Sequence, residues 1–243
     1  TNANLVLAPN GTGAILASIP DGTATGGNVR GTYALDLQRT RTNANQVPPS
    51  YTEYSTILNG RNNASNGNHC QVLNGLSNTV TYSSYSTVIN GTNCVTTGDY
   101  SMASGQSCTS RQYGFTHGIN CTNSGDSSVA FGGGTIVSGN YSFGCGNQNQ
   151  ATALNSFVSG YRAIAYLKSQ RTNGHTPPTW DTPYYGLAQS SELVASSSVV
   201  ALTSGATTDL TIDGDLIIPL GTNRFWNVEV KIYCSNFSNY GNC

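Results

Sequence analysis

Eight glycines recur at nearly constant intervals in the middle of this 243-residue chain, and their spacing limits what the chain can fold into. The intervals are 15, 16, 14, 13, 14, 14 and 14 residues. The glycines are Gly60, Gly75, Gly91, Gly105, Gly118, Gly132, Gly146 and Gly160. A fixed short period indicates a solenoid, in which each coil covers the face that its neighbour exposes. Helical and leucine-rich repeats need about 20 residues or more, so this period predicts two short strands and two turns per coil.

A large apolar residue stands three positions before each glycine, and we expect this column to form the core. It contains Ile57, Val72, Val88, Met102, Phe115, Val129, Phe143 and Phe157. The position two before the glycine is also mostly apolar, with Thr116 and Gly144 as exceptions. Neighbouring strand residues point to opposite faces, so two apolar columns predict one face inside the coil and one against another copy of the chain.

The position three after each glycine is small or short throughout, and three cysteines share it. The column contains Asn63, Asn78, Cys94, Cys108, Cys121, Thr135, Asn149 and Ala163. Stacked coils would place successive Cα atoms about 4.8 Å apart, which is within disulfide range. Disulfides and stacked, small buried thiols both remain open. The seven cysteines are an odd number, so at least one is free or intermolecular, and the redox compartment stays open.

Changes in the pattern divide the chain into four parts. Residues 1–53 read as an N-terminal β entry segment and connector, and residues 54–166 as the β-roll. Residues 167–191, rich in proline and tyrosine, read as a linker or cap. Residues 192–243 alternate like antiparallel strands, and we expect this segment to be incomplete. We expect Gly67, Gly98, Gly125 and Gly139 to supply the second turn of each coil, because glycine adopts positive φ most easily.

The stretch 127–142, which reads SSVAFGGGTIVSGNYS, resembles the head repeat of trimeric autotransporter adhesins. The same repeat occurs in phage and large-virus tail fibres, and residues 4–14, 19–31 and 34–41 are similar to the entry segment of such fibres. The resemblance implies a left-handed β-roll that trimerises, followed by a β-sandwich. The chain departs from the adhesin pattern in carrying Asn or Cys where alanine is usual.

Composition and the few ionisable residues exclude several functions. Only 9% of residues are charged and the net charge is −1, which argues against a nucleic-acid partner. No segment approaches 18 apolar residues, so we expect no membrane span. His69, His117 and His175 lack metal-ligand spacing, and we interpret His117 as one member of a polar column with Asn59, Asn74 and Asn90. We predict no catalytic residue, metal or cofactor.

Three functions remain as hypotheses. We favour a structural and attachment module: a homotrimeric virion fibre segment, on the virion surface or extracellular, that spaces or presents a surface binding a host glycan or protein. The alternative is a cell-surface adhesin or extracellular filament subunit with the same roll. A tailspike polysaccharide hydrolase is the least favoured, because it needs paired carboxylates and the chain has only 11 acidic residues. Tyr100, Tyr113 and Tyr141 could stack on sugars or on each other.

Overall fold

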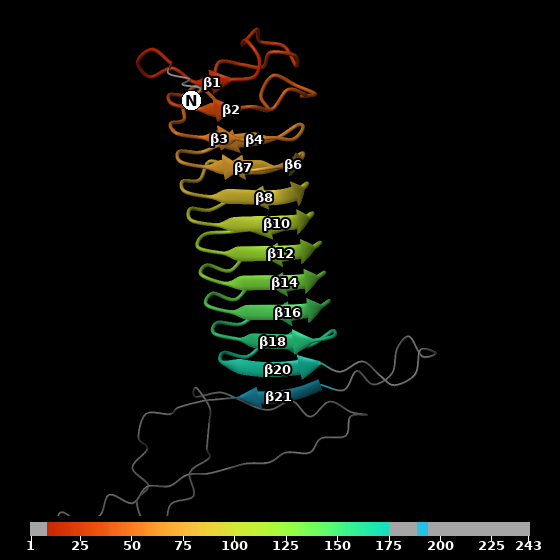
Figure 1. Cartoon of the computed structure of the whole chain (residues 1–243). Helices are drawn as coiled ribbons and strands as arrows, with labels where there is room; N and C mark the ends of the chain where they lie inside the picture. Colours follow the sequence, from red (N-terminus) through yellow and green to blue (C-terminus); the bar gives the residue numbers. More distant parts are fainter. Residues whose placement is uncertain (1–8, 175–188, 194–243) are drawn as a thin grey trace, which may run out of the picture. The chain divides into compact units, whose positions relative to one another are not determined.

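The computed structural model describes residues 9–174 and the backbone of 189–193 (Figure 1). This part of the chain is all β: its strands stack into a β-solenoid of about eight turns of about 14 residues, as the glycine period predicts. Each coil adds one strand to each of two sheets, and successive coils pair in parallel. The coils are stacked by backbone hydrogen bonds at the usual strand spacing of about 4.8 Å.

The larger sheet has 13 strands, which pair in the order of the chain except that β6 joins the edge of β8. Its strands are β1 (Ile15–Leu16), β2 (Leu35–Asp36), β3 (Thr56–Ile57), β5 (Gln71–Val72), β6 (Gly75–Leu76), β8 (Thr87–Thr92), β10 (Met102–Gln106), β12 (Phe115–Ile119), β14 (Val129–Gly133), β16 (Phe143–Asn147), β18 (Phe157–Gly160), β20 (Gln170–Gly174) and β21 (Gln189–Leu193). The smaller sheet has eight strands. They are β4 (Ala64–Asn66), β7 (Thr79–Thr81), β9 (Val95–Thr96), β11 (Thr109–Ser110), β13 (Thr122–Asn123), β15 (Ile136–Val137), β17 (Gln150–Ala151) and β19 (Ile164–Ala165).

A single bulge changes which apolar column is inside. Ala103 pairs with Val88 and Ser104 with Ile89, but Gly105 pairs with Gly91, so Asn90 is an extra residue in β8. The residue three positions before the repeat glycine therefore points inward in the coils up to β8 and outward in the coils from β10 onward. The predicted core column is wrong from Met102 onward: Ile57, Val72 and Val88 are fully buried, whereas Met102 is 36% and Phe157 41% exposed. The buried column is Ile57, Val72, Val88, Ala103, Thr116, Ala130, Gly144 and Val158.

The second corner of each coil is formed by side-chain-bearing residues in the left-handed conformation. Tyr85, Tyr100 and Tyr113, for example, have φ of 57°, 54° and 51°. The glycines expected to supply positive φ there, such as Gly125, do not have it. Gly125 is needed for a different reason: a Cβ atom on it would lie 2.2 Å from the carbonyl oxygen of Gly139.

The interior of the solenoid is narrow and about half polar, because the tight corners turn carbonyl groups inward where water cannot reach them. The small column found in the sequence is fully buried from Asn63 to Ala163. All of its members except Ala163 have side chains that donate to the carbonyl oxygen of the repeat glycine one coil further on: Asn149 Nδ2, for example, lies 2.8 Å from Gly160 O. A column of serines does the same at the other corner, as in the 2.7 Å bond from Ser86 Oγ to Gly98 O.

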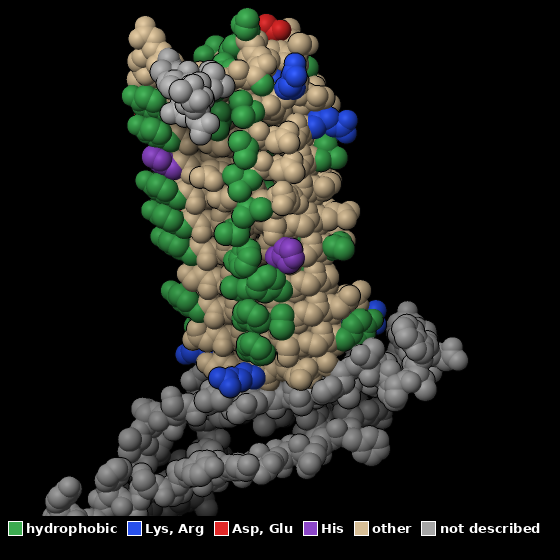
Figure 2. Space-filling view, in the orientation of Figure 1, with side chains coloured by type: hydrophobic (Ala, Val, Ile, Leu, Met, Phe, Trp, Pro, Cys, Tyr) green, Lys and Arg blue, Asp and Glu red, His purple; other side chains and the backbone are tan. Residues whose placement is uncertain are grey.

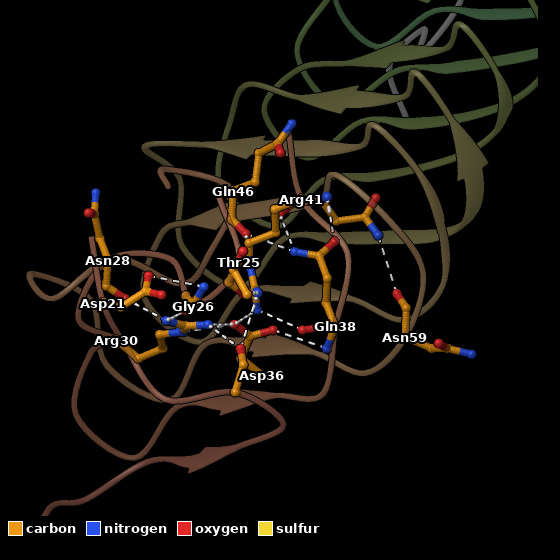
Figure 3. A network of polar contacts seen from close by, with 12 residues as sticks. Asp21, Thr25, Gly26, Asn28, Arg30, Asp36, Gln38, Arg41, Gln46 and Asn59 are labelled. Carbon is orange, nitrogen blue, oxygen red and sulfur yellow. Dashed lines mark hydrogen bonds and ion pairs between the residues drawn. The ribbon is translucent and has the colours of Figure 1, made fainter. Parts of the chain in front are cut away.

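The first coils are closed by a buried ionic network instead of an apolar core (Figure 3). The Asp36 carboxylate accepts from Arg30 Nε at 2.8 Å and from an Arg41 Nη atom at 2.7 Å, and all three side chains are fully shielded from water. Both guanidinium groups also donate to backbone carbonyls, and Gln38 links the network to the next coil by donating to Asn63 O at 3.1 Å. Full hydrogen bonding is what makes burial of these charges tolerable.

Parallel pairing extends beyond the segment predicted as the roll. Leu35 pairs with both Ile15 and Thr56, so residues from 15 onward belong to the same sheet as the repeats. At the other end β20 continues the larger sheet within the predicted linker, and β21 pairs with it in antiparallel fashion. The start of the predicted entry segment (residues 1–8), most of the predicted linker and the predicted C-terminal antiparallel segment from residue 194 lie outside the described residues.

Candidate interaction surfaces

An apolar strip runs along the outer face of the larger sheet. It is the line of hydrophobic side chains down the middle of the solenoid in Figure 2. We define the strip as Leu58, Leu73, Ile89, Met102, Phe115, Val129, Phe131, Phe143 and Phe157. These side chains occupy the two outward columns that flank the buried column, which follows from the alternation of a strand. The two columns carry no Asp, Glu, Lys or Arg from Thr56 to Ser159.

The aromatic members of the strip contact one another across the coils. The ring of Phe131 lies 5.0 Å from Phe115, edge to face, and 6.2 Å from Phe143. Phe143 stacks on Phe157 at 5.2 Å. These contacts do not hide the strip, since Leu58 remains 45% and Phe157 41% exposed. Polar residues such as Gln71, Ser104 and His117 share the two outward columns, but each coil from Leu58 to Phe157 contributes at least one apolar side chain to the strip. Partly exposed apolar side chains gathered on one sheet face are typical of association surfaces.

A second feature is a stack of aromatic rings along one edge of the solenoid, at the left in Figure 2. We call it the ring stack. Consecutive ring centroids are 4.8–5.5 Å apart and the planes are within 15° of parallel. The stack contains Tyr33, Tyr54, His69, Tyr85, Tyr100 and Tyr113. Tyr100 and Tyr113 therefore stack on each other, and the structure places His69 between two tyrosines rather than in a metal site.

Each member of the ring stack stands at a left-handed corner, a conformation that costs about 1 kcal/mol or more for a residue with a side chain. Stacking contributes about 0.5–1.5 kcal/mol for each aromatic pair, so the rings help to offset the strain of the corners. The sequence carries a signal for this stack, because its members stand six positions before Gly60, Gly75 and Gly91 but five before Gly105 and Gly118. The bulge at Asn90 explains the change in spacing.

The stacked cysteines Cys94, Cys108 and Cys121 are fully buried free thiols. Each Sγ atom lies 3.1–3.2 Å from the carbonyl oxygen of a repeat glycine in the next coil, where asparagine donates elsewhere in the same column. Hydrogen bonding with the Cys121 and Cys94 thiols, and then burial, raises the pKa of the Cys108 thiol. Burial likewise raises the pKa of Cys70. Hydrogen bonds with the Cys108 thiol lower the pKa of Cys94 to about 7 and the pKa of Cys121 to about 6. All three side chains are nevertheless fully buried and lie within hydrogen-bonding distance of glycine carbonyl oxygens, so they serve as buried hydrogen-bond donors.

His117 does not share a column with asparagines, because the bulge puts it in register with Ser104 and Ile89 instead. It is exposed, and its Nδ1 atom lies 2.7 Å from Ser104 Oγ. His175 lies outside the described residues. Within residues 9–174, no three His, Cys, Asp or Glu side chains gather in a way that could hold a metal ion.

A shallow hollow of about 430 Å³ lies on the outer side of the solenoid, near the corner formed by Gly134 and Arg162. Its other lining residues are Gln148, Gln150 and Ile164. Arg162 donates to Gln148 Oε1 at 2.5 Å, so the charge there is already engaged. This lining offers neither a nucleophile nor a general base.

The fold and surfaces together define a β-solenoid with one outward apolar strip and one stacked aromatic edge. A scan against models of protein families matched none of them, and a search of curated proteins also found no match. Among the described residues there is no apolar helix long enough to cross a bilayer.

Proposed function

We propose that this chain is a structural and attachment module, a stiff fibre segment that self-associates as a homotrimer and spaces or presents a host-binding surface. The apolar strip carries the proposal. Its side chains, among them Met102, Phe131 and Phe143, lie in a charge-free band on the face of a sheet whose other side is already buried. A second and third copy of the same solenoid would cover this band, because each copy repeats it at the same coil spacing.

Placement on a virion is supported by the resemblance of residues 127–142 to fibre and adhesin head repeats. The same module would serve a cell-surface adhesin or an extracellular filament, which share its physical task. We further propose that the chain is not an enzyme. Of the five acidic residues between positions 9 and 174, Asp36 is held by two arginines and is fully buried, and Glu53, Asp99 and Asp126 lie in different coils.

Light scattering of the intact chain tests the association. Three chains of 25.4 kDa give a particle of about 76 kDa, and we expect this mass with and without reductant because the described cysteines are free. The double variant Phe131→Ser/Phe143→Ser should shift the mass toward that of one chain. Ile136→Ser is the matched control, since Ile136 is also apolar and 41% exposed but lies on the smaller sheet. A wild-type monomer would overturn the proposal, as would a double variant that stays at the wild-type mass.

A further inference from the structure

The row of aromatic rings is interrupted at one corner, and the interruption is one coil thick. Ser127 occupies the corner after Tyr113, with φ of 53°, and Tyr141 occupies the next, with φ of 55°. The hydrogen bonds of the corner continue without change, since Ser127 N donates to Gln112 O at 3.0 Å and Tyr141 N to Asp126 O at 2.9 Å. Ser127 therefore stands in the column of the rings without supplying one.

Among the described residues no aromatic ring stacks on Tyr141, and Tyr141 is 66% exposed. Tyr113 stacks on one ring only, that of Tyr100, and its exposed fraction of 53% is close to the 55% of Tyr100. Two coil steps of about 4.8 Å separate the corners of Tyr113 and Tyr141, so rings oriented as in the stack would lie about 10 Å apart. In Figure 2 the row along the left edge is broken once, and one more hydrophobic side chain follows the break. The floor of this slot is the exposed, small side chain of Ser127.

From this geometry we infer that the slot between Tyr113 and Tyr141 binds one pyranose ring of a carbohydrate. A pyranose has two faces of C–H groups that pack on aromatic rings, and its saturated ring is thicker than a flat aromatic one, which suits a gap of two coil steps. Sugars also need polar partners around the rim of the ring. The corner supplies them in the Ser127 hydroxyl, in the Asp126 side chain, which is 38% exposed, and in Asn140.

Two features distinguish this slot from the rest of the ring stack. Elsewhere each face of a ring inside the stack is covered by its neighbour, so only ring edges are available. Polar groups around the slot are held in place: Asn140 Oδ1 accepts from Asp126 N at 2.9 Å, and Arg111 pairs with Asp126 at 3.5 Å. All the residues come from one chain, so the slot goes beyond the proposed self-association and does not depend on it.

Nuclear magnetic resonance on the full chain, labelled with carbon-13 at tyrosine, tests the inference with methyl β-D-galactopyranoside and methyl β-D-glucopyranoside as probes. We expect saturation transfer to the C–H protons of at least one sugar, with shifts confined to the resonances of Tyr113 and Tyr141. A single ring of this size should bind with a Kd of about 1 mM. Tyr113→Ala should weaken binding about fivefold to tenfold.

Two variants at position 127 decide the outcome. Ser127→Tyr fills the slot with a ring and should abolish sugar binding, whereas Ser127→Ala leaves the slot open and should retain it within about threefold, the loss expected from one hydroxyl. Equal binding by wild type and Ser127→Tyr would overturn the inference. So would the absence of sugar binding at 50-fold the expected Kd, or binding of p-cresol in the slot without binding of either sugar. The mass from light scattering is measured on the same samples, so failure of self-association and failure of the slot are separate results.

Discussion

The side chain of Asn78 donates a hydrogen bond to the carbonyl oxygen of Gly91, 2.7 Å away in the next coil. Its own Oδ1 atom accepts from the backbone nitrogen of Cys94 at 2.9 Å, and all of this takes place in a fully buried column. One side chain thus satisfies a backbone acceptor and a backbone donor that the corner leaves without partners inside the coil. The polar interior is therefore part of what holds successive coils together.

Asn78→Ala should lower the free energy of unfolding by about 2–4 kcal/mol, because it leaves two buried backbone groups without partners. Urea unfolding followed by circular dichroism measures the change. Asn74→Ala is the control: Asn74 is exposed and its Oδ1 accepts only from the neighbouring Gly75 nitrogen, so a loss below about 1 kcal/mol is expected. Equal losses in the two variants would contradict the role given to the buried column.

Gly118→Ala should prevent the coils from closing or cost more than about 3 kcal/mol. Gly118 has φ of 134°, and a Cβ atom there would lie 1.9 Å from the carbonyl oxygen of Gly132. Gly134→Ala is the matched control, since φ is 60° and the nearest atom to a Cβ is Gln148 Cγ at 3.5 Å. That variant should lose only about 1 kcal/mol in the same urea titration. Similar losses in both would show that close approach between coils is unimportant.

Asp36→Asn should destabilise the chain by about 3–5 kcal/mol, because it leaves the buried Arg30 and Arg41 side chains as uncompensated like charges. The loss should appear as reduced hydrogen-exchange protection concentrated in β1, β2 and β3. Asp126→Asn provides the comparison, as its pair with Arg111 is 38% and 57% exposed and should contribute less than about 1 kcal/mol. An Asp36→Asn variant of wild-type stability would mean that the network does not hold the first coils.

The described cysteines should alkylate according to burial and without prior reduction. With iodoacetamide on the native chain, Cys145, which is half-buried, should react before the four fully buried thiols. The buried set is Cys70, Cys94, Cys108 and Cys121. After unfolding in urea without reductant, peptide mass spectrometry should find all five modified. Modification of Cys94, Cys108 or Cys121 only after reduction would instead support the disulfide alternative.

The period of the glycines was enough to predict the solenoid and its two strands per coil, and it aligned the column of small residues, because successive coils approach each other equally closely in every repeat. The identity of the core column was not predictable in the same way. Asn59, Asn74 and Asn90 each add a residue before the glycine, and one added residue moves a side chain to the other face of a strand. The same shift made the ring stack hard to recognise in the sequence, because its members stand six residues before the repeat glycine up to Tyr85 and five residues before it from Tyr100 onward.

The buried network at Asp36 left no periodic signal, because Arg30 and Arg41 reach it from irregular loops rather than from repeats. The corner residues were missed for a related reason. Positive φ was expected at glycine, yet the solenoid places tyrosine at several of these corners, where stacking between coils helps to offset the strain. Such a contact depends on the residue one coil away and cannot be judged from local preference. The trimer, its host and its location remain predictions.

Ser127→Tyr should stabilise the solenoid by about 1 kcal/mol. The new ring would stack on both Tyr113 and Tyr141, and its corner has φ of 53°, matching the 51° at which Tyr113 already sits. The strain of the left-handed corner is therefore similar before and after the change, so the gain comes from the two ring contacts. Thermal unfolding of the wild type, Ser127→Tyr and Ser127→Ala measures it, with the alanine variant expected at or slightly below the wild type. If Ser127→Tyr unfolds no later than Ser127→Ala, the two tyrosines do not define a ring-sized slot, and the inferred sugar site loses its geometric basis.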